Sequence, residues 1–451
     1  MKTMNYLRRG LLTPALALCL LVSCEETTRT SDDHDKPHNP NTEVIVSNIG
    51  PESGGIGTKI VVSGSNFGND PSKVKLYFNA KEAFVMKVQD NAIYALVPKQ
   101  PGDFSTIKVS VDGKEGVLAG RQFQYFVRSS VTTIAGQQGI TTSVDGPALE
   151  ATMGRPSMLA ANDEGLVFVA DDGGMRLRMI SLADSKVTTL LEMNRPWQCA
   201  FTASYNKFFV LQREASGRPL LFYGLYKGSN WMESDSFYDQ TDASGNFIAG
   251  NIGYAGLAVD EEYVYLLALG ANNTVAKLVR VHQETKKVEL IGENFVLPNW
   301  NHICFNPKDR KIYLTAESFG RIYRFDPYLT PPGHDTPWIT MNDLELILGG
   351  GRGTVKEGNG TNAQFGSIEQ LCFDAEGNMY VVDYQNHVVW KIDPDLNATV
   401  IAGTPGVAGY ADGNPKESMF TTPYGITSTP DGILYVGEAG ENRLVRCISI
   451  Q

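Results

Sequence analysis

The chain has 451 residues, of which 42% are hydrophobic and 20% are charged, and its formal net charge is −11. This length suits two or more domains, and this composition is that of an ordinary globular protein. An acidic chain lacks the positive field that phosphate binding needs, so no nucleic acid partner is expected.

Residues 1–23 are predicted to be a lipoprotein signal peptide. Lys2, Arg8 and Arg9 form a basic start, and residues 11–23 form an apolar run that is too short to span a bilayer. The run leads into "LVSC", which resembles the lipobox of bacterial lipoproteins. The resemblance implies that Cys24 carries a lipid and becomes the first residue of the mature protein. The alternative is a plain secretory signal with a chance cysteine.

Residues 24–43 are predicted to be the lipidated cysteine and a flexible acidic tether. The stretch "EETTRTSDDHDKPHNP" has almost no apolar residue and should be solvated. Acidic residues directly after a lipidated cysteine resemble the export signal of some Gram-negative lipoproteins. The resemblance implies a protein anchored in the outer membrane through Cys24 and facing the cell exterior.

Residues 44–127 predict a β-sandwich, because short β-rich runs alternate with Gly, Pro and Ser turns. Pro51, Gly54, Gly55 and Thr58, followed by "VSGSNFG", resemble the opening of the IPT/TIG family of immunoglobulin-like domains. That resemblance implies a fold and no chemistry, since such domains act mostly as spacers or docking modules.

Residues 131–451 contain a repeated sequence motif, which we call the phrase. "TTIAGQQGITTSVDG" starts at Thr132, "TVIAGTPGVAGYADG" starts at Thr399, and a shorter copy starts at Glu345. The glycines that close the Ile-Ala-Gly element and its shorter counterpart are Gly136, Gly349 and Gly403. Their spacings of 213 and 54 residues fit four units and one unit of about 53 residues, and the 48 residues after Gly403 make a sixth. Asp145 and Asp412, near the end of the two long copies, are expected to form turns.

Each unit also contains an apolar strand, a tight turn, a second strand and a third strand, so the phrase supplies a fourth. Six four-stranded units predict a closed six-bladed β-propeller, and the fold class is therefore all-β. The pattern resembles the NHL repeat, most closely from Asp412 to Arg446. Since the last unit ends after its third strand, residues 131–136 are predicted to complete the last blade.

Function in such propellers gathers where the innermost strands begin and in the loops between the second and third strands. The alignment of the six units places aromatic, amide and carboxylate residues there. Trp197 and Tyr424 are expected to flank a slot for a sugar ring beside the small Ser157. The predicted ligand-binding residues are Trp197, Gln198, Asn301, His302, Glu369, Gln370, Tyr424, Asp171, Asp383 and Glu438.

No cofactor, metal or catalytic group is assigned. The NHL-type amidating lyase holds zinc with histidines, but only His302 and His387 fall near the predicted mouth. Glu369, Asn301 and Asp383 could supply oxygen ligands for calcium, as in a propeller lactonase. Cys199, Cys304, Cys372 and Cys447 lie in apolar runs without CxxC spacing, so buried thiols are expected.

The architecture predicts a surface lipoprotein that presents a propeller mouth to a glycan associated with polysaccharide uptake. An outer-membrane transporter is then a candidate partner. One alternative is a scaffold that binds proteins. A second is a metal-dependent enzyme of the lyase or lactonase type.

Overall fold

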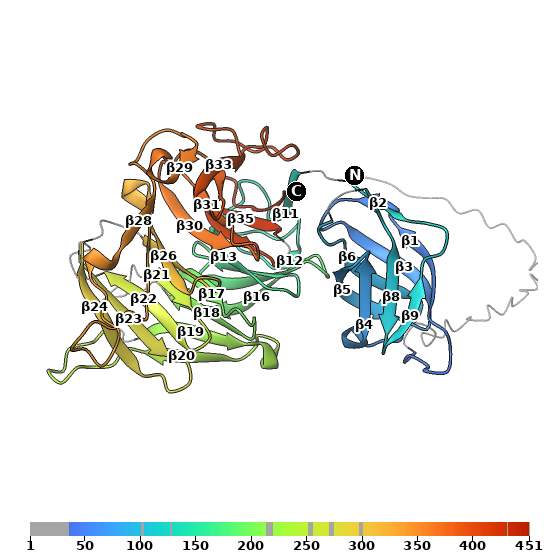
Figure 1. Ribbon diagram of the computed structural model, residues 1–451, viewed down its shortest axis with the longest axis horizontal. Helices are drawn as coiled ribbons and strands as arrows, with labels where there is room; N and C mark the ends of the chain where they lie inside the picture. Colours follow the sequence, from blue (N-terminus) through green and yellow to red (C-terminus); the bar gives the residue numbers. More distant parts are fainter. Residues whose placement is uncertain are drawn as a thin grey trace, which may run out of the picture.

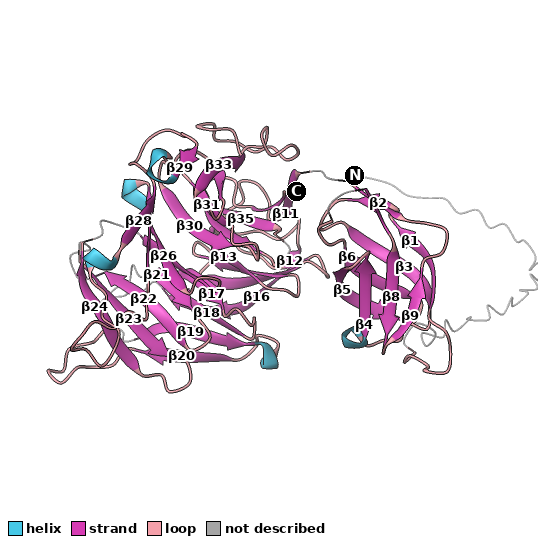
Figure 2. Cartoon of the chain, viewed as in Figure 1, coloured by secondary structure: helices cyan, strands magenta, loops and turns pink. Residues whose placement is uncertain are grey.

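The structure consists of β-strands joined by turns and a few short 3-10 helices (Figures 1 and 2). This computed structural model describes residues 36–100, 103–126, 129–212, 220–250, 256–269, 275–296, 301–430 and 432–450. The predicted all-β class is confirmed. Within these ranges there is no helix with the length and apolar character required to cross a bilayer.

The N-terminal domain is an immunoglobulin-like β-sandwich. A seven-stranded sheet, β1-β3-β6-β5-β4-β8-β9, faces a three-stranded sheet, β2-β10-β7. Alternate residues of β3 and β8, such as Ile60, Val62, Ile107 and Val109, enter its core, as expected for strands with one buried face. Its elements are β1 (Ile45–Gly50), β2 (Ser53–Gly54), β3 (Lys59–Ser65), η1 (Pro71–Lys73), β4 (Val74–Phe78), β5 (Lys81–Gln89), β6 (Ala92–Leu96), β7 (Asp103–Ser105), β8 (Ile107–Val111), β9 (Lys114–Val117) and β10 (Phe123–Tyr125).

The end of the predicted tether is attached to this sandwich. Asn66 accepts a hydrogen bond from the Asn39 amide at 2.7 Å and donates to the carbonyl oxygens of Asn39 and Thr42 at 3.0 and 2.9 Å. His38 contacts the Asn66 carbonyl oxygen through its Nδ1 at 2.8 Å. The chain is therefore held from His38 onward, which the low apolar content of this stretch did not indicate.

The C-terminal domain is a β-propeller of six sheets arranged in a ring (Figure 1). We number the sheets as blades 1 to 6 in chain order of their innermost strands. Blades 1 and 5 carry a short fifth strand on the outside. Blade 1 consists of β12 (Gly146–Pro147), β13 (Pro156–Ala161), β14 (Leu166–Asp171), β15 (Arg176–Ser181) and β16 (Lys186–Glu192), and blade 2 consists of β17 (Pro196–Phe201), β18 (Lys207–Gln212), β19 (Leu220–Tyr226) and β20 (Ser234–Tyr238). Blade 3 consists of β21 (Gly256–Val259), β22 (Tyr263–Leu269), β23 (Ala276–His282) and β24 (Val288–Phe295), and blade 4 consists of β25 (Asn301–Asn306), β26 (Lys311–Ala316), β27 (Arg321–Phe325) and β28 (Glu345–Leu348). Blade 5 consists of β29 (Gly358–Asn359), β30 (Ile368–Phe373), β31 (Met379–Asp383), β32 (Val388–Ile392) and β33 (Asn397–Ala402), and blade 6 consists of β34 (Pro423–Ser428), β35 (Leu434–Glu438), β36 (Val445–Ser449) and β11 (Ser130–Ala135).

Short 3-10 helices lie between some of the propeller strands. They are η2 (Lys227–Ser229), η3 (Glu317–Phe319), η4 (Met341–Asp343) and η5 (Gly360–Asn362). Each has three residues, so none of them forms a layer of the fold.

The ring is closed by pairing the first strand of the propeller with the last. β11 runs antiparallel to β36, with Val131 opposite Ile448 and Thr132 opposite Cys447. The sequence prediction that an N-terminal strand completes the last blade is confirmed. This pairing covers the outer edge of β36, which would otherwise expose unpaired backbone groups.

The repeated phrase recurs because the glycine that closes its Ile-Ala-Gly element, or the shorter counterpart of that element, cannot be replaced by a residue with a side chain. Gly136, Gly349 and Gly403 have φ values of 100°, 89° and 94°. A Cβ atom at these positions would lie 2.7, 2.1 and 2.5 Å from a backbone carbonyl oxygen of the same blade. The fourth strand of the blade thus ends at a point where only glycine fits.

The innermost strands β13, β17, β21, β25, β30 and β34 surround the central channel, and each contacts the next around the ring. We call the end of the channel where these strands begin the upper mouth, and the end where they finish the lower mouth. Polar residues at the upper mouth form the candidate site.

The sandwich packs against blades 1 and 6 of the propeller (Figure 1). Ile56 of the sandwich joins the apolar cluster of these two blades. Lys59 Nζ donates to Ser185 Oγ at 2.6 Å, and a Cβ at Gly165 would lie 3.1 Å from the Phe84 ring. The two domains therefore share an interface with apolar and polar contacts.

Candidate functional site

The innermost strands bring most of the predicted residues to the upper mouth. Trp197, Glu369 and Tyr424 are each the second residue of an innermost strand. Three of the four predicted carboxylates, Asp171, Asp383 and Glu438, are each the last residue of the second strand, in blades 1, 5 and 6. By strand, the predicted residues are Trp197 and Gln198 on β17, Asn301 and His302 on β25, Glu369 and Gln370 on β30, Tyr424 on β34, Asp171 on β14, Asp383 on β31 and Glu438 on β35.

Trp197 and Tyr424 do not enclose the open slot that the sequence predicted. Their rings contact each other edge to face, with centroids 5.6 Å apart. The exposed fractions of the two residues are 2% and 9%, and Ser157 between them is fully buried. Because the inner strands converge on the axis, side chains on blades 2 and 6 meet above blade 1 and fill this space. A role of either ring in binding stays a prediction.

Two tyrosines and two glutamates lie side by side next to this aromatic contact. The Tyr384 and Tyr424 rings are 5.6 Å apart, and the Tyr384 hydroxyl donates to Glu317 Oε1. Burial and this hydrogen bond raise the pKa of Tyr384 to about 12. Burial, followed by the charge of Glu369, raises the pKa of Tyr424. Both hydroxyl groups therefore keep their protons at neutral pH.

Two arginines share one aspartate at the same mouth. Asp172 Oδ2 lies 3.3 Å from Arg155 Nη1, and its Oδ1 lies 3.1 Å from Arg195 Nε. The Asp172 side chain is 4% exposed, whereas the arginine side chains are 36% and 46% exposed. Arg155 also lies over the Tyr424 ring, with 5.4 Å between its Cζ and the ring centroid. One carboxylate thus positions two guanidinium groups that solvent still reaches.

We call these seven residues the mouth cluster: Arg155, Asp172, Arg195, Glu317, Glu369, Tyr384 and Tyr424. Its exposed part consists of the arginines and the partly buried Tyr384. Its buried part consists of the carboxylates and Tyr424.

Gln198 and His302 use their polar atoms to join neighbouring blades. Gln198 Oε1 accepts from the Leu257 amide of blade 3 at 2.8 Å. His302 Nδ1 accepts from the Leu371 amide of blade 5 at 3.4 Å. Burial lowers the pKa of His302 to about 3, so this ring is neutral at physiological pH. A role of these two side chains in ligand binding stays a prediction.

Gln370 joins three blades. Its Oε1 accepts from the amides of Ile426 and Leu159 at 2.9 and 3.0 Å, and its Nε2 donates to the Leu159 carbonyl oxygen at 2.8 Å. The side chain passes Gly425, where a Cβ would lie 2.2 Å from the Ser157 carbonyl oxygen. Glycine at position 425 therefore allows blade 6 to approach blade 1 closely, and a Cβ there would also lie 3.1 Å from Gln370 Oε1.

Asp171 and Glu438 form buried ion pairs within their blades. Asp171 Oδ2 lies 3.3 Å from Arg178 Nη1, and Glu438 Oε1 lies 2.6 Å from Arg446 Nη1. All four side chains are fully buried. Burial raises the pKa of Glu438 above its ordinary value, although Arg446 opposes the shift.

Asp145 and Asp412 are more than turn formers, which corrects the sequence interpretation. Asp145 Oδ1 lies 2.7 Å from Arg178 Nη2, and Asp412 Oδ1 lies 2.5 Å from Arg446 Nη2. They also accept from the Thr189 and Thr133 amides at 2.8 and 2.9 Å. Each aspartate thus ties the end of the repeated phrase to the buried arginine of its blade.

Asp383 occupies the corresponding place in blade 5, where Trp390 replaces the arginine. It accepts from the Gly366 amide at 2.7 Å and from the Asn386 side chain at 2.8 Å. Burial raises its pKa. These three predicted carboxylates therefore have structural partners, and a ligand-binding role for them or for Glu369 stays a prediction.

Several residues singled out from the sequence lie outside the described residues. They are the predicted signal peptide of residues 1–23 and Cys24, and the side chain of Asn301 belongs with them. Over the described ranges, no group of three or more His, Cys, Asp or Glu residues is arranged to hold a metal ion.

Arg155 and Arg195 were not singled out from the sequence, and Tyr384 was expected at the mouth only as part of the loop of residues 383–387. The two arginines had a signal in the repeat, because "GRPS" and "NRPW" place Arg-Pro at the same point before β13 and β17. Tyr384 directly follows Asp383 at the end of β31. Its contact with Glu317 joins blades 5 and 4 and has no signal in the spacing.

Comparison with known proteins matches part of the chain to a family. Residues 45–125 match the model of the IPT/TIG domain. A chloroplast protein of Arabidopsis thaliana, SUPPRESSOR OF QUENCHING 1, is 34% identical over 80 residues, which is 18% of this chain and 7% of that protein. The chain thus spans only a small fraction of this relative's length.

Solved structures from Bacteroides match this chain over most of its length. A protein of unknown function from Bacteroides thetaiotaomicron is 27% identical, with a TM-score of 0.59 over 92% of this chain and all of that chain. Two structures described as auxiliary nutrient binding proteins come from Bacteroides thetaiotaomicron and Bacteroides ovatus. They are 21% and 22% identical, with TM-scores of 0.56 and 0.58, and each match covers 92% of this chain and 99% of the other. At these identities the last two show the fold alone.

Proposed function

We propose that this protein is a lipid-anchored protein of the outer membrane whose upper mouth binds a glycan during nutrient uptake. The NHL type of the propeller, the anchor at Cys24 and the orientation toward the cell exterior are parts of the same proposal. An outer-membrane transporter is the partner that such a role requires.

The mouth cluster is the observation that carries the proposal. Sugar hydroxyl groups both donate and accept hydrogen bonds, so their sites combine donors and acceptors on a rigid frame. Arg155 and Arg195 offer solvent-exposed donors, and Asp172 holds both of them in place. The Tyr384 ring is partly exposed beside them and offers an apolar face for the C–H groups of a sugar.

The similarity to the two Bacteroides structures supports the nutrient part of the proposal. Both are described as auxiliary nutrient binding proteins, and each is matched over 99% of its length. A shared fold does not by itself establish a shared ligand. The glycan is therefore inferred from the side chains of the mouth.

A protein partner is the second candidate for the ligand. The loops of blades 1 and 6 expose large apolar side chains: Ile140 at 41%, Val144 at 54%, Met175 at 58%, Val407 at 42% and Tyr410 at 42%. Exposed apolar residues that gather in one region are typical of protein contacts.

The ligand is tested by binding of purified residues 25–451 to a glycan array. We expect a defined set of glycans to bind, and we expect Arg195→Ala to weaken that binding. Arg121→Ala is the matched control, because it removes a half-exposed arginine from the sandwich. A protein that binds no glycan, or whose binding is weakened equally by both substitutions, would contradict the glycan site.

The anchor is tested separately with Cys24→Ala in a Gram-negative host. The wild-type protein should fractionate with the outer membrane, and the variant should leave the membrane fraction. If the variant remains membrane-bound, the lipid anchor at Cys24 is wrong.

A further inference from the structure

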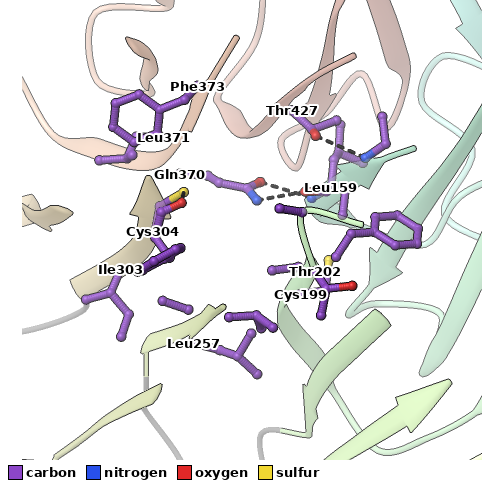
Figure 3. A pocket seen from close by; sticks show the side chains of 18 of the residues that line it. Leu159, Cys199, Thr202, Leu257, Ile303, Cys304, Gln370, Leu371, Phe373 and Thr427 are labelled. Atoms are coloured by element: carbon purple, nitrogen blue, oxygen red, sulfur yellow. Dashed lines mark hydrogen bonds between the residues drawn. The ribbon is translucent and has the colours of Figure 1, made fainter. Parts of the chain in front are cut away.

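The lower half of the central channel contains a cavity of about 160 Å³. It is lined by residues from the middle and the end of the innermost strands and by the turns that follow them. Figure 3 looks into this cavity and shows Leu159, Leu257, Ile303 and Leu371 around it. The mouth cluster is not among its lining residues, so the cavity is separate from the proposed glycan site.

The cavity wall carries no charge at neutral pH. Its described lining contains no Asp, Glu, Lys or Arg. Burial raises the pKa of the Cys304 thiol to about 12, raises that of Cys199, and lowers that of His302 to about 3. A charged ligand would therefore lose its hydration without gaining an ionic partner.

His302 contributes one hydrogen-bond donor to this wall. Its Nδ1 accepts from the Leu371 amide, so the proton of the neutral ring is on Nε2. In the described part of the chain, no residue is hydrogen-bonded to this Nε2. The residue is 3% exposed and lines the cavity. The Nε2 hydrogen can therefore be donated to an acceptor on a molecule that occupies the cavity.

Other polar side chains of the wall already have partners. Gln370 is bonded to Leu159, and Thr427 Oγ1 accepts from the Ala161 amide at 3.0 Å (Figure 3). Thr202 Oγ1 contacts Ser204 Oγ at 3.1 Å. A sugar would need partners for all its hydroxyl groups, and this wall does not supply them.

Aromatic rings surround the lower mouth of the cavity. Phe201, Phe305 and Phe373 end three of the innermost strands or lie one residue before the end, and Tyr205 lies in the turn after β17. All four are only partly buried. Flat apolar walls of this kind favour planar apolar ligands.

We propose that this cavity binds a small, neutral, aromatic molecule that carries a single hydrogen-bond acceptor. The ring would lie among the leucine, isoleucine and phenylalanine side chains, and the acceptor would face Nε2 of His302. A cavity of about this size holds one ring of benzene dimensions. The inference concerns a site distinct from the upper mouth and does not depend on glycan binding there.

Benzonitrile and toluene are the test probes, because they have similar shapes and only benzonitrile carries an acceptor. With purified residues 25–451, we expect both to raise the Tm and benzonitrile to bind about tenfold more tightly. The nitrile stretching frequency should shift on binding as it does on hydrogen bonding. The tenfold difference and the shift should both disappear in His302→Phe.

Ala200→Leu fills the cavity and should abolish binding of both probes, whereas Ala375→Leu, on an exposed turn of blade 5, should not. Arg195→Ala at the upper mouth should leave probe binding unchanged, which separates this site from the glycan site. The proposal is overturned if neither probe binds or if binding survives Ala200→Leu. It is equally overturned if toluene binds as tightly as benzonitrile, or if glucose binds in a way that Ala200→Leu abolishes.

Discussion

Gln370 shows how a single side chain stabilises a ring of blades. It satisfies two backbone amides and one carbonyl group that belong to blades 6 and 1. The innermost strands have one free edge each, so their outward-facing backbone groups need such partners. Gln198 and His302 do the same for blades 3 and 5. Three polar residues near the axis therefore stabilise the propeller.

Gln370→Leu should lower the free energy of unfolding by about 2–4 kcal/mol, because it leaves buried amide and carbonyl groups without partners. Urea unfolding measures this loss. Gln138→Leu is the control, since Gln138 is exposed and makes one hydrogen bond, to Asn442. Equal stability of the two variants would show that Gln370 does not join the blades as described.

His302 should make stability depend on pH below neutrality. The folded protein protonates His302 only near pH 3, whereas the unfolded chain protonates it near the ordinary value of about 6.5. Between these values the unfolded state binds the additional proton, so acidification destabilises the folded state. The stabilising contribution is complete above pH 6.5 and is lost as the pH falls.

The matched variant is His302→Gln, because Gln198 and Gln370 make the same kind of bond at this position in blades 2 and 5. Between pH 7.5 and 4.5, the wild type should lose about 3 kcal/mol more stability than this variant. His334→Gln, at an exposed histidine, should behave as the wild type. Parallel pH profiles for His302→Gln and the wild type would contradict the buried neutral histidine.

At the scale of the elements, the spacing of three glycines along the sequence was the main basis for predicting the blades. Gly136, Gly349 and Gly403 combine positive φ with a carbonyl oxygen too close for a side chain, so the sequence had to repeat there. Blade 2 lacks a clear copy of the phrase, so only the period of the repeat predicts its outermost strand β20. The Asp145 and Asp412 pairs with buried arginines were missed, because side chains 33 and 34 residues apart meet only after the blade folds.

β11 supplies the test of ring closure at this scale. Val131 is fully buried against blade 6, while Thr132 on the other face of the strand is exposed. Val131→Asp should therefore lower the free energy of unfolding by at least about 3 kcal/mol, because it buries a charge without a partner. Thr132→Asp should change it by less than about 1 kcal/mol. Similar thermal melting curves for the two variants would contradict the pairing of β11 with β36.

At the scale of the molecule, strand patterns were enough to predict a sandwich followed by a propeller. The candidate site was harder to predict, since it depends on the convergence of the inner strands on one axis. That convergence brings Trp197 against Tyr424 and closes the slot expected between them. It also places Arg155 and Arg195 on one aspartate. The solvent-exposed arginines of the upper mouth are thus not the predicted residues themselves, but they lie next to them.

Titration calorimetry of a glycan with residues 25–451 and their variants is the most direct test of binding at the upper mouth. Arg195→Ala should weaken binding roughly tenfold without changing the Tm, because its side chain is half exposed and faces the mouth. Trp197→Ala should instead lower the Tm, because its ring is buried. Arg121→Ala should change neither quantity. Wild-type affinity in Arg195→Ala, together with full affinity in a Tyr384→Ala variant, would contradict a glycan site at the mouth cluster.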